Sequence, residues 1–239
     1  MSEILKIHNL TGGYKEGVNI LHDISMEVKQ GEAVGIIGLN GSGKSTFGKA
    51  LMGMIPYRWG VIEFNGEDVT GFSTPELAHL GISIMQQGGK VFPNLSVWDN
   101  LKLATQGNNS QLSIVNSHLA EIIPLLQQPE RRLRNMMADK LSGGQKHHLS
   151  LAMTLATNPQ LVILDEPSAG LSPKAVDEMF VMLRAVRENM GVTIILIEQN
   201  IAKAVEFCER SLLIQQGQIV NYIVGNDVCI IEREMFNRN

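Results

Sequence analysis

The sequence predicts an α/β fold built on a parallel sheet, and three observations lead to this prediction. An apolar run at residues 33–37 ends in a glycine-rich stretch that opens a helical run. Two further apolar runs, at residues 161–164 and 192–197, have the length and composition of buried parallel strands. A helical stretch from about residue 173 to residue 189 lies between them, and this spacing indicates a βαβ unit.

The remaining segments predict antiparallel strands and additional helices. Residues 5–10 and 24–28 alternate apolar and polar side chains, which is typical of half-exposed antiparallel strands. From about residue 97 to residue 159 the chain turns helical. Residues 211–220 indicate a β-hairpin that turns at Gln216 and Gly217.

Composition indicates one globular domain. A chain of 239 residues with 44% hydrophobic side chains can bury a sizeable core. A net charge of −4 argues against a nucleic-acid-binding protein, for which a basic surface is expected. The sequence has neither an apolar run of about 18 residues nor an apparent secretory leader, so we expect a cytoplasmic chain. Cys208 and Cys229 are too few for a metal site, and we expect both to be reduced thiols.

The glycine-rich stretch after the first apolar strand has the spacing of a phosphate-binding loop. Its glycines let successive backbone N–H groups point into one cavity, and the helix that follows adds the positive end of its dipole. Lys44 is placed to reach the β- and γ-phosphates of a nucleotide, and the Ser45 hydroxyl to ligate Mg²⁺. The predicted phosphate-binding residues are Gly38, Leu39, Asn40, Gly41, Ser42, Gly43, Lys44, Ser45 and Thr46.

Two carboxylates, Asp165 and Glu166, follow the apolar strand at residues 161–164. The carboxyl ends of strands are where open α/β sheets place their ligands. We expect Asp165 to hold Mg²⁺, through water, and Glu166 to polarise an attacking water.

An LSGGQ stretch at residues 141–145 stands before that strand and just ahead of a helical run. Ser142 and Gln145 have the spacing of a capping box, which predicts that a helix starts here. An anion site at a helix start needs the same exposed N–H groups, so both interpretations can hold at once.

With these three motifs in this order, the chain closely resembles the ATP-binding cassette (ABC) family of ATPases from about residue 4 to residue 220. The resemblance implies a P-loop NTPase fold with a RecA-like core, an N-terminal antiparallel β subdomain and an α-helical subdomain inserted at about residues 97–159. All of these would form a single ATP-binding domain of residues 1–239. The resemblance also implies that the protein binds ATP and Mg²⁺ and hydrolyses ATP.

In this family the LSGGQ turn of one subunit caps the γ-phosphate bound by another. The resemblance therefore implies a homodimer, or a heterodimer with a second ABC ATPase subunit. The residues that would contact the partner's nucleotide are Ser142, Gly143, Gly144 and Gln145.

The smaller landmarks of the family fall on single residues. Tyr14 sits where the family keeps an aromatic that stacks on adenine, and the alternative is an ordinary loop tyrosine. The Q-loop glutamine, which contacts Mg²⁺ and the attacking water, is Gln86 or Gln87, and the spacing to residues 91–95 favours Gln87. Where most members carry a switch histidine, this chain has Gln199. The implied catalytic residues are thus Glu166, Gln87 and Gln199.

The sequence Glu198-Gln199-Asn200 is similar to that of the ATPase subunits of branched-chain amino acid importers. Related urea and short-amide importers share the same sequence motifs, so the motifs do not identify the solute. This likeness implies a subunit at the inner face of the cell membrane that drives membrane permease subunits. A non-transport ABC ATPase and a regulatory cassette remain the alternatives, although the intact Lys44 and Glu166 argue against the second.

Two groups of side chains have open interpretations. Permease subunits of the family insert a short helix beside the Q-loop, and Val91, Phe92, Pro93 and Trp98 are candidates to line that groove, although Phe92 and Trp98 fit the core of the helical part equally well. The adjacent His147 and His148 are expected on a solvated or packed helix face rather than in a metal site.

Overall fold

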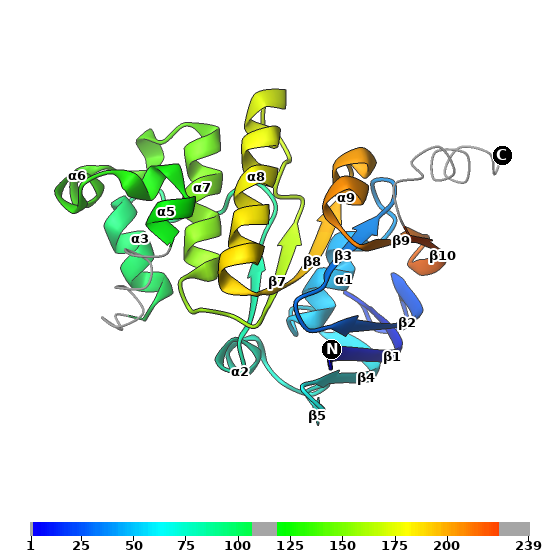
Figure 1. Cartoon of the computed structure of the whole chain (residues 1–239). Coiled ribbons are helices and arrows are strands. Elements are labelled where there is room, and N and C mark those ends of the chain that lie inside the picture. Colours follow the sequence, from blue (N-terminus) through cyan, green and yellow to red (C-terminus); the bar gives the residue numbers. More distant parts are fainter. Residues whose placement is uncertain (1, 107–118, 225–239) are drawn as a thin grey trace. The chain divides into compact units, whose positions relative to one another are not determined.

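The computed structural model describes residues 2–106 and 119–224, so Cys229 and part of the predicted helical subdomain lie outside the described residues (Figure 1). The chain divides into two compact units. The first unit comprises Met1–Ile82 and Thr193–Asn239, and the second comprises Ser83–Val192. Among the described residues, no helix has the length and apolar character needed to cross a membrane.

An antiparallel sheet forms one part of the first unit, with strands in the order β2-β1-β4-β5. Its strands β1 and β2 contain the two alternating segments at residues 5–10 and 24–28 and pair antiparallel, as predicted. Strand β4 was not predicted, because Gly60, with φ +106°, interrupts the alternating pattern of its sequence. A Cβ at Gly60 would lie 2.6 Å from the carbonyl oxygen of His8, so glycine is required for this close approach to β1. The strands are β1 Glu3–Gly13, β2 Leu21–Lys29, β4 Tyr57–Phe64 and β5 Glu67–Asp68.

The other strands of the first unit lie in the order β10-β9-β3-β8. The central strand β3 is parallel to both β8 and β9, and every residue of β3 and β8 is buried, which explains their continuous apolar sequences. A hairpin joins β9 to β10 through Gln216 and Gly217, both with positive φ, as predicted. The elements are β3 Ala33–Ile37, β8 Thr193–Glu198, β9 Arg210–Gln215, β10 Gln218–Val224, α1 Lys44–Leu51, α2 Thr74–His79 and α9 Ile201–Phe207.

The second unit contains strands β6 and β7, which are neighbours in their sheet. It also contains most of the helices that the described residues form (Figure 1). The predicted helix near residues 173–189 is α8, which ends at Gly191 in the left-handed conformation with φ +62°. The strands are β6 Ile82–Met85 and β7 Leu161–Asp165, and the α-helices are α3 Val97–Ala104, α5 Ala120–Ile122, α6 Glu130–Asn135, α7 Gly143–Leu155 and α8 Pro173–Met190. Two 3₁₀ helices occupy Pro124–Gln127 and Ala138–Lys140.

Helix α3 packs against α6 and α7 and carries the buried side chain of Trp98. The Trp98 side chain of α3 is only 6% exposed, and the Arg134 guanidinium of α6 lies 4.6 Å from the centroid of its ring. Phe92, in contrast, is 49% exposed. Of the two aromatic residues with open interpretations, Trp98 therefore belongs to the core and Phe92 remains available on the surface.

Candidate functional site

The predicted phosphate-binding loop leads from β3 into α1 in the first unit. Gly41 and Gly43 have φ values of +79° and +106°, which residues with a Cβ rarely adopt. Gly43 is the N-cap of α1, and no side-chain hydrogen bond caps this helix. Lys44 is buried, and its Nζ donates hydrogen bonds to the carbonyl oxygens of Gly38 at 2.9 Å and Leu39 at 3.1 Å. The loop therefore curls around the lysine ammonium, as a phosphate cradle requires.

The Ser42 hydroxyl supports the assignment of this loop to an anion. Its oxygen is buried and has no hydrogen-bond partner among the described residues. Buried polar atoms are nearly always paired, so an unpaired hydroxyl in this glycine-rich loop fits a ligand phosphate. The Ser42 carbonyl accepts a hydrogen bond of 2.8 Å from the backbone N–H of Gly217, so the β9–β10 hairpin braces the loop.

Tyr14 lies next to the helix that starts at this loop. The Nζ atom of Lys49, in α1, is 5.9 Å from the centroid of the Tyr14 ring. The tyrosine side chain is 43% exposed, so the ring has accessible area for a flat aromatic ligand.

Gln199 follows β8 at the same sheet edge from which the phosphate-binding loop begins. The parallel register pairs Ile37 with Glu198, so Gly38 and Gln199 are the next residues of adjacent strands. Gln199 is exposed there, whereas Glu198 is only 1% exposed. One oxygen of the Glu198 carboxylate accepts hydrogen bonds from the backbone N–H groups of Gln199 at 3.1 Å and Asn200 at 3.2 Å.

Glu198 is a residue that our sequence reasoning missed. The signal was available, because Glu198 ends an apolar strand just as Asp165 does. Its carboxylate holds the turn that presents Gln199, so Glu198 acts through the backbone of its neighbour.

In the second unit, the predicted catalytic carboxylate lies against the predicted Q-loop. Asp165 is the last residue of β7 and is 2% exposed, and Glu166 follows at 8% exposed with φ +47°. The Gln87 side-chain amide donates a hydrogen bond of 2.6 Å to the Glu166 carboxylate. Because β6 and β7 are neighbours, the segments that follow them meet at their ends. This contact favours Gln87 over Gln86 as the Q-loop glutamine.

The LSGGQ stretch forms the start of α7. The Ser142 hydroxyl accepts a hydrogen bond from the Gln145 backbone N–H at 3.3 Å, and the Gln145 side-chain oxygen accepts one from the Ser142 N–H at 3.0 Å. This reciprocal pair confirms the predicted capping box. A Cβ built at Gly143 or Gly144 would meet nothing within 4 Å, so this helix start is open to an approaching ligand.

The predicted residues thus form two groups, each within one unit. The first unit holds residues 38–46, Tyr14 and Gln199, and the second holds residues 142–145, Gln87, Asp165 and Glu166. The first group fits a nucleotide polyphosphate, and a hydroxyl oxygen such as that of Ser45 is a ligand type that suits a hard cation such as Mg²⁺.

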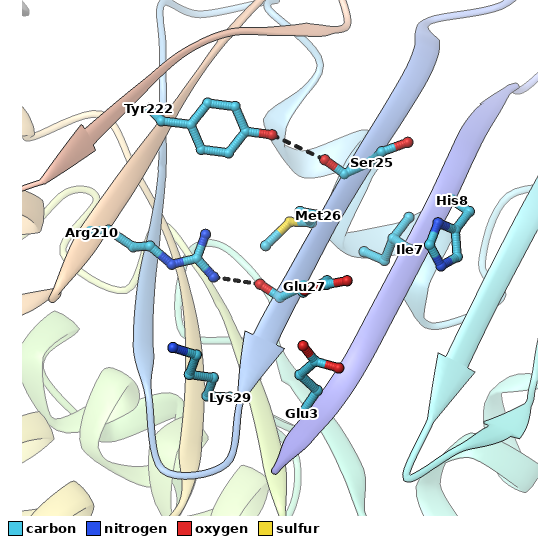
Figure 2. Close-up of a pocket in the computed structure, with 9 residues that line it drawn as sticks. All are labelled: Glu3, Ile7, His8, Ser25, Met26, Glu27, Lys29, Arg210 and Tyr222. Carbon is cyan, nitrogen blue, oxygen red and sulfur yellow. Dashed lines mark hydrogen bonds between the residues drawn. The ribbon is translucent and has the colours of Figure 1, made fainter. Parts of the chain in front are cut away.

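A pocket of about 440 Å³ lies elsewhere in the first unit, and none of the predicted residues line it (Figure 2). Two of its polar side chains bond to the chain itself. Arg210 donates to the carbonyl oxygen of Glu27, and the Tyr222 hydroxyl donates to that of Ser25 at 3.2 Å (Figure 2). Arg210 also forms a 2.7 Å ion pair with Glu32. Burial raises the pKa of Glu32, but the Arg210 hydrogen bond and a backbone N–H hold that pKa below its ordinary value. These contacts fasten β9 and β10 to β2.

Known proteins resemble this chain along most of its length. The family profile described as "ABC transporter" matches residues 21–169. The branched-chain amino acid transport ATP-binding protein BraG of Pseudomonas aeruginosa is 33% identical over 216 residues, covering 89% of each chain. The probable branched-chain amino acid transport ATP-binding protein LivF of Archaeoglobus fulgidus is 32% identical over 237 residues, covering 98% of this chain and 97% of LivF. The lipopolysaccharide export ATP-binding protein LptB of Escherichia coli is 30% identical over 235 residues, covering 98% of this chain and 95% of LptB.

The three-dimensional likeness agrees with the sequence likeness. The structure of MJ1267, described as an ATP-binding cassette of an ABC transporter, superposes with a TM-score of 0.82. It is 25% identical, and the alignment covers 99% of this chain and 98% of MJ1267.

Proposed function

Because the chain belongs to the ABC transporter family, we propose that it is the ATP-hydrolysing subunit of an importer of branched-chain amino acids or related small solutes. The chain is an ABC transporter ATP-binding subunit, and it hydrolyses ATP with Mg²⁺ as cofactor. The proposed solute class is supported by the names of BraG and LivF and by the Glu198-Gln199-Asn200 sequence. LptB, whose name describes export, has a similar level of identity. The solute class and the direction of transport are therefore our proposal.

The observation that carries the proposed mechanism is the hydrogen bond of 2.6 Å between Gln87 and Glu166. We propose that Glu166 accepts a proton from the water that attacks the γ-phosphate. The Gln87 amide holds one carboxylate oxygen and so sets the orientation of the Glu166 side chain. The left-handed backbone of Glu166, which is unfavourable for a residue with a Cβ, is consistent with a side chain held for function.

The phosphate-binding residues have complementary proposed roles. Lys44 and the loop N–H groups hold the β- and γ-phosphates, and Tyr14 stacks on the adenine. Gln199 donates a hydrogen bond to the γ-phosphate, where negative charge develops during hydrolysis. When bound, Mg²⁺ neutralises phosphate charge, and Ser45, Gln87 and Asp165 are the residues proposed to hold it.

The open start of α7 supports the proposed dimer. A Cβ at Gly143 or Gly144 would meet nothing within 4 Å, and a second subunit's γ-phosphate is the anion proposed to bind at this helix start. That subunit is proposed to be a second copy of this chain or a related ABC ATPase.

The exposed Phe92 supports a permease contact at the inner face of the membrane. Its backbone is clamped by Asn100, which accepts from the Phe92 N–H at 2.8 Å and donates to the Phe92 carbonyl at 3.0 Å. Asn100 is fully buried, so the loop that presents Phe92 is anchored to α3. An exposed aromatic side chain on an anchored loop is suited to bind a partner helix.

The test is reconstitution with the permease subunits and binding protein encoded beside the gene. ATP hydrolysis in proteoliposomes is measured with binding protein loaded with leucine, with urea, or with no solute. We expect leucine to stimulate hydrolysis and the Lys44→Ala variant to show none under any condition. Stimulation by urea alone would refute the proposed solute class. A hydrolysis rate that is the same with and without the permease subunits would favour a non-transport ABC ATPase.

A further inference from the structure

His147 is a buried polar residue to which the predicted mechanism gives no role. It lies in α7, two residues after the end of the LSGGQ turn, and its side chain is 5% exposed. Its neighbour His148 is only half-buried. A buried imidazole needs a hydrogen-bond partner, and the identity of that partner indicates what the residue does.

The partner of His147 is the backbone immediately after the proposed catalytic carboxylate. The His147 Nδ1 atom lies 2.8 Å from the carbonyl oxygen of Pro167, the residue that follows Glu166. A carbonyl oxygen only accepts, so Nδ1 carries the proton and donates it. Burial lowers the pKa of His147 and the bond to Pro167 only partly opposes this, so the ring is neutral at pH 7 with its proton on Nδ1.

The same ring also contacts the segment that carries Gln87. Gly89 has φ +58°, and a Cβ there would lie 2.8 Å from the His147 Cδ2 atom and 3.0 Å from its backbone nitrogen. The segment after β6 therefore packs against His147 so closely that only glycine fits. Gln87 also bonds to Glu166, so the segment after β6 contacts the turn after β7. Through His147, the start of α7 contacts both of them.

We propose that His147 is a positioning residue that couples the LSGGQ turn of α7 to Glu166. It holds the Glu166–Pro167 turn and the Gln87 segment in place against the start of α7. A phosphate bound at that start therefore fixes the carboxylate that accepts the proton of the attacking water. This inference rests on the proposed roles of Glu166 and Gln87. It adds a residue that acts through the backbone of Pro167 and Gly89.

The test compares two substitutions in the full-length chain. His147→Leu keeps the apolar volume but removes the donor, whereas His147→Asn places an amide N–H where Nδ1 was. We expect His147→Leu to lower kcat by about 10-fold to 100-fold, the effect of a small misplacement of a reacting group, while the KM for ATP changes little. We expect His147→Asn to recover most of the rate, and the control His148→Leu to match the parent.

A purely structural role would lower the melting temperature and kcat equally in both variants, and that result would overturn the proposal. So would a parent-like rate in His147→Leu. Glu166→Gln, measured in the same assay, separates the two levels of inference. If Glu166→Gln is inactive while His147→Leu is active, only the His147 role fails; if Glu166→Gln keeps full turnover, the proposed site itself fails.

Discussion

At the scale of single residues, the candidate site depends on buried polar groups whose orientation is set by close partners. The Lys44 ammonium is held by two loop carbonyls, and the Glu166 carboxylate is held by Gln87. The buried Glu198 carboxylate accepts from two successive backbone N–H groups and so fixes the turn of Gln199. Each arrangement fixes a functional group before a ligand arrives, which lowers the entropy lost on binding.

The first prediction concerns Gln199. We expect Gln199→Ala to lower kcat by about 10-fold to 100-fold, which corresponds to the loss of one hydrogen bond to a charged group, with ATP affinity nearly unchanged. Gln199→His restores a donor that titrates, so its activity should depend on pH near the ordinary imidazole pKa of about 6.5, whereas the parent should show no such step. Steady-state ATPase rates from acid to mildly alkaline pH measure both effects. A parent-like rate for the alanine variant would remove Gln199 from the mechanism.

At the scale of elements, the starts of α1 and α7 differ in a way that suits their proposed tasks. The start of α1 has a glycine N-cap and no side-chain cap, so its N–H groups are left to the phosphate-binding loop and its ligand. The start of α7 is capped by the Ser142–Gln145 capping box, so the turn is rigid before a phosphate approaches.

The second prediction separates capping from catalysis at α7. Ser142→Ala should cost about 1 kcal/mol of folding stability and also abolish most hydrolysis, because Ser142 is proposed to contact the partner's γ-phosphate. The matched control is Ser73→Ala, which removes the capping box of α2. We expect Ser73→Ala to lower stability by a similar amount and leave hydrolysis unchanged. Urea unfolding and ATPase rates measured on both variants make the comparison, and equal ATPase rates would contradict the proposed role of Ser142.

At the scale of the whole molecule, each compact unit carries only part of the predicted machinery. The phosphate-binding loop, Tyr14 and Gln199 are in the first unit, whereas Glu166 and the LSGGQ turn are in the second. A Cβ at Gly143 or Gly144 would meet nothing within 4 Å, so the start of α7 has room for an anion brought by another subunit. An assembly of two subunits is therefore the expected working form.

The third prediction addresses that assembly. Glu166→Gln keeps the size of the side chain, but the amide cannot accept a proton from water. We therefore expect hydrolysis to fall by about 100-fold or more while MgATP still binds. The bound ATP should then hold two subunits together. Size-exclusion chromatography with light scattering should show twice the monomer mass with ATP and the monomer with ADP. A monomer in both conditions would contradict the proposed dimer of this chain and leave a second kind of ATPase subunit as the partner.

Local patterns in the sequence were sufficient to predict several elements and the main motifs. The buried strands before Gly38 and after Thr193, the capping box at Ser142 and the hairpin turn at Gln216 each depend on residues a few positions apart. Backbone propensity, capping and turn chemistry act over that same range, so these predictions were confirmed. Strand β4 was missed because Gly60 interrupts its pattern, and only pairing with β1 makes that glycine favourable.

Only the tertiary structure decided which distant side chains meet. Gln87 and Glu166 are 79 positions apart, and the hydrogen bond between them follows from two strands being neighbours, which no local pattern specifies. The burial of Trp98 and the exposure of Phe92 were equally compatible with the sequence, because both residues are aromatic and close in the chain. The contact of His147 with Pro167 and Gly89 was likewise hidden, since a histidine on a helix shows its partners only when the chain is packed. The sequence by itself determined the family, the nucleotide chemistry and the elements that carry it, whereas long-range packing decided how the catalytic carboxylate is held.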